Sequence, residues 1–457
     1  MEVSPLNPYK RWRTLAIVTV AVGIASGIAG MALGLLLRVV QHISYGYDLH
    51  RVVGGGGETF LQGVTAASPL RRLLVLCVCG AVAGIGWSLL RRFGSPLVPI
   101  RKAIRQDGPR MPFLATTIHA SLQIVTVGLG SPLGREVAPR ELGAVLATWL
   151  SENACLSAET SRIMIACGAG AGLAAVYNVP LGGTLFTLEV LLGTFRFSAL
   201  VPALATSVIA TAVAWLGLGN VPQYTLPPVA ISPSLIVWSI MMGPVFGLAA
   251  YLFVRVTEAA HAHPPQGWHR LAWCAVVFPG IGLLAIAFPQ LLGNGKSLAR
   301  AGFGNEIGVG LAATLVLIRL LGIAGTLRAG AAGGLLTPGL SIGALLATVL
   351  STSWNSAWPA GSLGAFAVVG SAAFLASSMQ MPLTAVVLIP EFTRVGHDFF
   401  IPISLAVVGS VSIFRLCTQH SVQPLQKPTR IGLPAARTAE QRSHRVETPP
   451  VKISRSE

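Results

Sequence analysis

Long apolar stretches recur along the sequence and constrain the fold more than any other feature. Examples are Thr14–Val40, Leu73–Leu90, Leu235–Val254, Ile307–Leu327 and Ile401–Leu416. Each is near the roughly 20 residues that a helix needs to span the hydrocarbon of a bilayer. One stretch could be a signal sequence or a buried core, but this many predict a polytopic membrane protein. Composition agrees, because only 11% of the residues are charged, against about 25% in soluble domains.

Basic residues flank these spans at both ends of the chain. Lys10, Arg11 and Arg13 precede the first span, and a basic run from Lys427 to Arg455 follows the last. The net charge of +16 therefore lies in loops and ends rather than on one face, so we expect no nucleic-acid partner. The positive-inside bias places both termini in the cytoplasm. We expect integration into a lipid bilayer, in a bacterial inner (plasma) membrane.

Glycine and proline interrupt the apolar sequence at membrane depth. The interruptions are Gly94–Pro99, Gly128–Pro139, Tyr177–Pro180, Gly333–Pro338 and Met381–Pro382. Non-helical backbone is tolerated in a membrane only where protein buries it or where it lines a watery cavity. Interruptions in both halves of a chain are typical of inverted-repeat transporters with a site near the midplane. The predicted fold is an all-α bundle of tilted and broken helices.

These observations predict three regions. Residues 1–13 form a cytoplasmic N-terminal segment, residues 14–418 a transmembrane domain, and residues 419–457 a basic cytoplasmic tail without a regulatory domain. The transmembrane domain divides into inverted halves at about 14–218 and 230–418. A glycine-rich insert at Gly54–Gly57, polar to about Ser68, is expected to be a flexible loop between the first two long helices.

Two of the interruptions resemble helix starts that can bind an anion. Unpaired backbone N–H groups and the helix dipole favour negative charge there. In Gly333–Pro338 we expect Leu335 and Leu336 to offer such N–H groups. In Gly134–Pro139 a carboxylate, Glu136, stands where the amides point. An ionised glutamate would compete with the anion and a protonated one would leave, so we predict that Glu136 is a gate. The alternatives are a salt bridge to Arg135 or a helix N-terminal acid.

Taken together, several segments resemble the CLC family of chloride channels and proton-coupled chloride exchangers, over about Thr14 to Pro428. They are Gly134-Arg135-Glu136, GAGAGLAAVYNVPLGGTLFTLE from Gly168 to Glu189, Arg319, Gly333–Pro338, and PLTAVVLIPEFT from Pro382 to Thr393. The chain departs from the family pattern at Val137-Ala138, where Gly-Pro is usual, and at Leu336, where phenylalanine is usual.

The resemblance implies a homodimer in which each subunit has its own pore and Glu136 is the external gate. Chloride or another small anion would be held by backbone near Arg135, Glu136 and Val137 and near Gly334, Leu335 and Leu336. Family members also use a serine in a G-S-G-I-P loop and a tyrosine near the last helix. Here the loop is Gly94-Ser95-Pro96-Leu97-Val98-Pro99, so either Ser95 or Pro96 takes the serine's place, and Gln426 takes the tyrosine's.

Position 190 bears on mechanism. Proton-coupled members generally carry an internal glutamate directly after the position of Glu189, and this chain has Val190. The valine favours a voltage- or pH-gated chloride channel. The alternative is a proton-coupled exchanger of chloride or fluoride, because the fluoride branch also lacks that glutamate and still exchanges protons.

The other polar residues carry weaker predictions. We expect Glu189 to pair with helix ends or an arginine, Glu391 to fix the end of a late helix, Arg319 to satisfy carbonyls, and His119 to be a hydrogen-bonded packing residue rather than a proton relay. The sequence shows no nucleophile, phosphate-loop or metal-ligand motif, so we expect no metal, no cofactor and no enzymatic activity. Two rivals are a carrier of larger organic anions and a membrane-embedded enzyme using Glu136 and Arg135, with Glu141 as the only local second acid.

Overall fold

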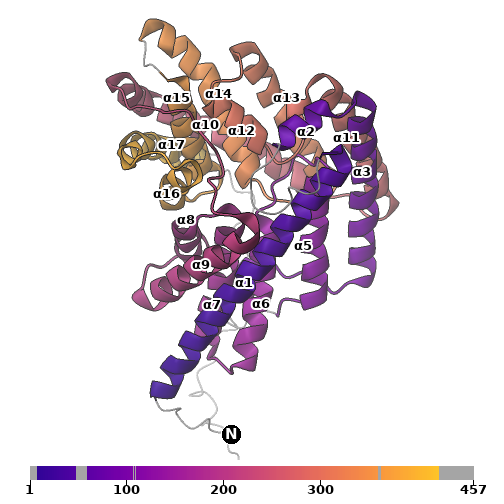
Figure 1. The fold of residues 1–457 in the computed structure, drawn as a ribbon, viewed down its shortest axis with the longest axis vertical. Coiled ribbons are helices and arrows are strands. Elements are labelled where there is room, and N and C mark those ends of the chain that lie inside the picture. The colour runs from indigo at the N-terminus through magenta and orange to yellow at the C-terminus, as the bar shows by residue number, and fades with distance from the viewer. Residues whose placement is uncertain (1–7, 48–58, 106–107, 109, 359–361, 421–457) are drawn as a thin grey trace, which may run out of the picture. The chain divides into compact units, whose positions relative to one another are not determined.

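The computed structural model describes residues 8–47, 59–105, 108, 110–358 and 362–420, and this part is helical without a strand (Figure 1). The first group of helices is α1 (Pro8–Tyr45), α2 (Phe60–Ala66), α3 (Pro69–Phe93), α4 (Ile100–Ala103), α5 (Phe113–Gly128), α6 (Val137–Asn153), α7 (Ala158–Tyr177), α8 (Pro180–Leu185) with the π-helix η2 (Phe186–Leu192), and α9 (Phe197–Leu218). The second is α10 (Pro233–His261), α11 (Trp268–Ala287), η3 (Pro289–Leu291), α12 (Lys296–Phe303), α13 (Val309–Arg328), α14 (Leu336–Ala357), α15 (Leu363–Ser378), α16 (Pro382–Thr393), η4 (His397–Phe399) and α17 (Phe400–His420).

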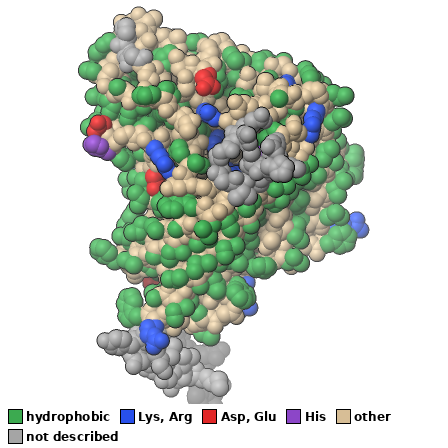
Figure 2. All heavy atoms as spheres, in the orientation of Figure 1, with side chains coloured by type: hydrophobic (Ala, Val, Ile, Leu, Met, Phe, Trp, Pro, Cys, Tyr) green, Lys and Arg blue, Asp and Glu red, His purple; other side chains and the backbone are tan. Residues whose placement is uncertain are grey.

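Nine helices of the described part are long and apolar enough to cross a membrane. The first, α1, is apolar on both sides: it buries Val18 and Val22 while exposing Ile17, Ile24 and further residues on the opposite face. A helix that is apolar all round suits a lipid environment. On the face drawn in Figure 2, hydrophobic side chains cover most of the surface and charged side chains are few. The predicted helical membrane protein is confirmed.

Every predicted interruption separates two helices. Gly94–Pro99 lies between α3 and α4, Tyr177–Pro180 joins α7 to α8, and Met381–Pro382 lies between α15 and α16. Gly128–Pro139 spans the gap between α5 and α6, and Gly333–Pro338 precedes and enters α14. In both α6 and α14 the proline falls in the first helical turn, where its missing N–H has no intrahelical partner to lose.

The short helices α8 and α16 hold each other's starts. Glu189, in η2, accepts hydrogen bonds from the backbone N–H groups of Leu383 (3.0 Å) and Thr384 (2.7 Å). Glu391, in α16, accepts from those of Leu181 (2.9 Å) and Gly182 (2.6 Å). The expected contact of Glu189 with a helix end is confirmed. The expectation for Glu391 is wrong in its partner, because the helix end that it stabilises is the start of the early helix α8.

Arg319 pins the backbone that leads to the site. It is fully buried in α13 and donates to the carbonyl oxygens of Leu291 (2.8 Å), Gly293 (2.7 Å) and Pro132 (3.0 Å). Pro132 precedes α6, whereas Leu291 and Gly293 precede α12. The guanidinium thus satisfies carbonyls of two distant segments, as expected, and fixes one against the other.

The predicted loop after α1 is partly wrong. Gly54–Gly57 lies outside the described residues, but the polar stretch that follows contains α2. Thr59 caps this helix through the N–H of Gln62, and the Gln62 side chain accepts from the N–H of Thr59. This capping box is a helix-start signal that the glycine-rich context concealed.

The chain divides into two units, Met1–Cys417 and Thr418–Glu457. Only the first three residues of the second unit are described. The predicted boundaries of the transmembrane domain, its halves and the tail therefore stay predictions.

Candidate functional site

Two loops from distant parts of the chain meet at an isolated antiparallel bridge. The N–H of Gly134 donates to the carbonyl of Gly334 (2.7 Å), and the N–H of Gly334 donates to the carbonyl of Gly134 (2.8 Å). Gly134 lies shortly before α6 and Gly334 shortly before α14. The bridge therefore sets the start of one helix beside the start of the other, and brings together Glu136 and the predicted anion-binding backbone of Leu336.

The carboxylate of Glu136 occupies the start of α14. Its side chain is fully buried, and its Oε1 accepts a hydrogen bond from the N–H of Leu336 at 2.6 Å. Glu136 precedes the first residue of α6, yet its side chain makes no capping hydrogen bond to that helix. Glu136 is thus an acid at a helix N-terminus, as the second alternative has it, but its carboxylate stabilises the start of α14 rather than that of its own helix. The carboxylate instead lies on a backbone donor with the positive end of a helix dipole behind it.

Both bridging glycines are needed for this approach. A Cβ atom at Gly134 or at Gly334 would collide with the carboxylate of Glu136. At Gly339, one turn into α14, an added Cβ would meet nothing closer than 3.5 Å. The absence of side chains at positions 134 and 334 creates the space in which the carboxylate lies.

Two hydroxyl groups lie beside Glu136 on the side of its second carboxylate oxygen. The hydroxyl of Tyr177, the last residue of α7, donates to Oε2 of Glu136 at 3.3 Å and lies 2.9 Å from the hydroxyl of Thr337. Sequence reasoning missed both residues. The available signal was weak: Tyr177 is the one hydroxyl-bearing residue in the run from Gly168 to Tyr177, which otherwise consists of glycine, alanine, leucine and valine.

In the described part of the chain, Arg135 and Arg140 make their hydrogen bonds to groups other than the carboxylate of Glu136. Arg135 donates to the side-chain oxygen of Gln223 (3.4 Å), and its guanidinium lies 5.0 Å from the centre of the Tyr177 ring. Arg140 donates to the backbone carbonyl of Glu136 (2.9 Å) and lies over the Phe186 ring. The alternative in which Glu136 forms a salt bridge with Arg135 is not what the structure shows.

A basic pocket opens next to Arg135. Its volume is 380 Å³, and four of its lining residues are cationic: Arg38, Arg135, Lys296 and Arg300. None of the lining residues that the structure describes is Asp or Glu. A cavity lined by one sign of charge concentrates ions of the opposite sign.

Lys296 is the lysine of this pocket. Enclosure by the pocket, followed by the charges of Arg135, Arg38 and Arg300, lowers the pKa of Lys296 to about 7. The side chain is also exposed to water at the pocket surface, and solvent screening offsets part of this shift. The ammonium group is charged below this pKa and neutral above it.

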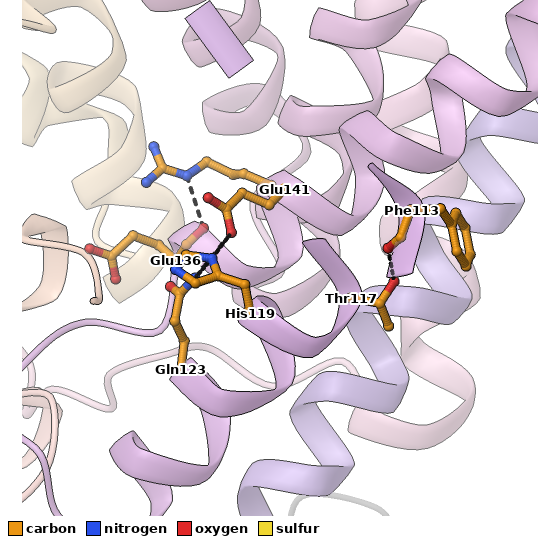
Figure 3. A network of polar contacts seen from close by, with 7 residues as sticks. Phe113, Thr117, His119, Gln123, Glu136 and Glu141 are labelled. Atoms are coloured by element: carbon orange, nitrogen blue, oxygen red, sulfur yellow. Dashed lines mark hydrogen bonds and ion pairs between the residues drawn. The ribbon is translucent and has the colours of Figure 1, made fainter. Parts of the chain in front are cut away.

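A separate polar cluster lies between α5 and α6. Glu141 accepts from Gln123 (3.0 Å) and lies 2.8 Å from Nδ1 of His119. Figure 3 shows these three side chains meeting, while the carboxylate of Glu136 points away from them. His119 is a hydrogen-bonded packing residue, as expected. The enzyme alternative required the carboxylates of Glu141 and Glu136 to face each other, and they do not.

The predicted inner ligands do not join this constellation. Ser95 and Pro96 are exposed in the segment between α3 and α4, and within the described chain the structure brings Leu336 and Tyr177, not these two, to the carboxylate of Glu136. Gln426 lies outside the described residues. Val190 lies in η2 and packs against the apolar core. Val137 opens α6, and Leu335 is the residue before α14.

Comparisons with known proteins match most of the chain. A family model described as voltage gated chloride channel matches residues 75–415. The voltage-gated ClC-type chloride channel ClcB of Citrobacter koseri is 28% identical over 430 residues, which cover 90% of this chain and 98% of the relative. The H(+)/Cl(-) exchange transporter ClcA of the same organism is 26% identical over 355 residues, 74% of each chain.

A solved structure supports the same architecture. The structure of a slow cyanobacterial Cl-/H+ antiporter superposes with a TM-score of 0.76 at 20% identity, covering 90% of this chain and 95% of the other. At this identity the likeness concerns the fold alone. The predicted inverted-repeat bundle of tilted and broken helices is confirmed.

Proposed function

The chain belongs to the CLC family, whose family model is described as voltage gated chloride channel. We propose that it exchanges a small anion for protons across a membrane, with chloride as the first candidate and Glu136 as the gate. It is an integral membrane protein of a family of anion transporters. We prefer proton-coupled exchange to the channel function that Val190 by itself favours. Fluoride is the alternative anion.

One observation carries the proposal: the buried carboxylate of Glu136 lies 2.6 Å from the N–H of Leu336. An ionised carboxylate oxygen and a halide are both anions that accept from such a donor, so the two compete for one place. Conduction needs coordination weak enough to release the ion. The proposed donors are the backbone amides of Leu335 and Leu336 and of Arg135–Val137, which meet this need without a fixed cation in contact with the ion. The N–H of Gly334 is not among them, because it already donates to the carbonyl of Gly134.

The position of Glu136 also favours coupling to protons. A carboxylate that has lost its water must keep a donor or become neutral, because a buried unpaired charge is very costly. The side chain of Glu136 therefore leaves the N–H of Leu336 most easily after its carboxylate has been protonated. Each opening then takes up a proton, so anion passage and proton movement alternate. Among the relatives, ClcA is named an exchange transporter and ClcB a channel.

The basic pocket is the proposed outer entrance. Arg38 lies near the end of α1 opposite its start at Pro8, so cytoplasmic termini place the pocket outside. Arg135 both lines the pocket and adjoins Glu136. An anion gathered there is one residue away from the gate. Ser95, Pro96 and Gln426 stay proposed for the inner end. The described contacts of Glu136 with Tyr177 and Leu336 lie within one chain, which supports a separate pathway in each subunit of the expected homodimer.

The test is anion flux and proton movement in liposomes containing the purified protein. An imposed chloride gradient should drive protons uphill, and Glu136→Gln should abolish this coupling and flatten the pH dependence of flux. Glu141→Gln is the matched control, because it removes a nearby carboxylate that faces His119. Anion flux without proton pumping would favour the channel alternative over exchange. Absence of anion flux would remove the transport function, and flux of gluconate would favour a carrier of larger organic anions.

A further inference from the structure

We infer that the hydroxyl group of Tyr177, polarised by that of Thr337, is a ligand of the transported anion, and that it holds the carboxylate of Glu136 only while this carboxylate occupies the anion's place. The inference rests on the proposed function, because it names a further ligand at the same site. It adds a side-chain donor to the backbone amide of Leu336, which supplies the other side of the site.

The three side chains form a chain of hydrogen bonds with a defined direction. An ionised Glu136 only accepts, so the hydroxyl of Tyr177 donates to its Oε2 at 3.3 Å. The oxygen of Tyr177 can then accept, and Thr337 donates to it across 2.9 Å. A donor that itself accepts a hydrogen bond is polarised and donates more strongly. Thr337 therefore strengthens Tyr177 as a ligand of a negative partner.

The Tyr177 ring cannot follow the carboxylate when Glu136 leaves. The side chain is 3% exposed, and the Arg135 guanidinium and the Phe392 ring lie 5.0 Å and 5.4 Å from its ring centre. Directly after it, Asn178 turns the backbone into the left-handed region at a φ of 57° and ends α7. The hydroxyl therefore stays in the site. A buried donor that loses its acceptor costs free energy, and the incoming anion removes this cost.

Neutral hydroxyl groups also suit an ion that must bind and leave. They add donors without the fixed positive charge that would retain the anion. The family resemblance assigns hydroxyl ligands to a serine and a tyrosine, whose positions here hold Ser95 or Pro96 and Gln426. Ser95 and Pro96 are exposed, whereas Tyr177 already contacts the carboxylate that imitates the anion, and Thr337 contacts the hydroxyl of Tyr177.

A competing role for the pair is that of a latch that only holds Glu136 closed. The two roles separate in the Glu136→Ala background, where no carboxylate is present to be latched. Chloride binding to the purified full-length protein, measured by isothermal titration calorimetry, should weaken about tenfold there on Tyr177→Phe, since a hydrogen bond to a charged group contributes at least that factor. Thr337→Val should weaken it about threefold through the lost polarisation, and Thr337→Ser should restore it.

Tyr45→Phe in the same background is the matched control. Tyr45 is also buried, and its hydroxyl donates to the carbonyl of Leu129 at 2.9 Å. Its chloride affinity should stay within about twofold of the background, because the hydrogen bond that it loses lies outside the site.

The outcomes separate this inference from the proposed function. Unchanged affinity on both Tyr177→Phe and Thr337→Val, or no chloride binding by Glu136→Ala protein, overturns the ligand assignment, whatever the liposome assay shows. Hydroxyl-dependent chloride binding in a protein that passes no anion in liposomes supports the assignment and overturns the proposed exchange.

Discussion

The two loops that meet at the Gly134–Gly334 bridge differ in one respect that decides their chemistry. Each glycine donates to and accepts from the other, so the bridge itself is reciprocal. Two residues further on, the first loop carries Glu136 and the second carries Leu336. The carboxylate of one loop therefore lies on the bare N–H of the other at 2.6 Å. A reciprocal bridge of two glycines thus holds two different groups together, a carboxylate and a backbone N–H.

The helices α8 and α16 show the opposite case. Glu189 follows Pro180, and Glu391 follows Pro382, at the same spacing, and Asn178 and Gln380 adopt left-handed backbone at matching places, with φ of 57° and 52°. Both halves carry a carboxylate here, and each caps the other's helix. The comparison separates the three glutamates. The carboxylates that recur in both halves hold helix ends, and the one without a counterpart, Glu136, is the proposed gate.

The largest effect is expected where the two segments are held together. Arg319→Met removes the donor to three carbonyls, from Leu291, Gly293 and Pro132. We expect the free energy of unfolding to fall by about 3 kcal/mol, because buried acceptors of a charged donor are left without it. Denaturant unfolding in detergent micelles measures this. Arg415→Met, at an exposed position of α17, should change it by less than about 0.5 kcal/mol; equal losses would contradict the clamp.

Gly334→Ala tests whether anion and carboxylate share one place. The added methyl group would fill the position of the Glu136 carboxylate. We expect anion flux to fall about tenfold or more at every pH, by loss of the Leu336 contact. Gly339→Ala, whose Cβ meets nothing closer than 3.5 Å, should leave flux within about twofold. A rise in flux with Gly334→Ala would mean that the methyl only expels the gate and that the anion passes elsewhere.

Glu189→Gln and Glu391→Gln test the symmetric pair of carboxylates. Each substitution keeps one acceptor oxygen and removes the charge, so we expect each to lower the free energy of unfolding by about 1 kcal/mol. Neither should alter the pH dependence of flux, in contrast to Glu136→Gln. If one of the two changed the proton-to-anion ratio, that carboxylate would have a part in transport and the symmetry would not separate the roles.

The smallest effect is expected at the pocket. Since the pKa of Lys296 is lowered to about 7, its charge is present below that pH and lost above it. In a Glu136→Gln background, initial anion uptake at low ionic strength should be about threefold faster at pH 6 than at pH 8. Lys296→Met should remove this difference, and Lys102→Met, exposed and outside the pocket, should keep it. An unchanged profile with Lys296→Met would show that the pocket's charge does not limit entry.

Local sequence sufficed wherever the signal was local. The apolar spans, the glycine and proline interruptions and the helix start at α14 could be predicted from the bilayer's intolerance of unpaired backbone and from the geometry of helix ends. Glu136 could be singled out because a carboxylate is rare at membrane depth and because a helix start favours an anion. The partners of Glu391 and Glu141 could not, because a carboxylate accepts from any donor that tertiary folding brings near.

The sequence by itself determined an all-helical membrane protein with broken helices, two halves and a conspicuous glutamate. Only the tertiary structure decided that the carboxylate of Glu136 lies on the N–H of Leu336, 200 positions away, and that Tyr177 contacts this carboxylate and Thr337 contacts Tyr177. The physical reason is that periodicity and helix-end chemistry depend on neighbours in the chain, whereas the contact between two loops depends on how whole helices pack. The missing side chains of Gly134 and Gly334 acquire their meaning only once the loops have met.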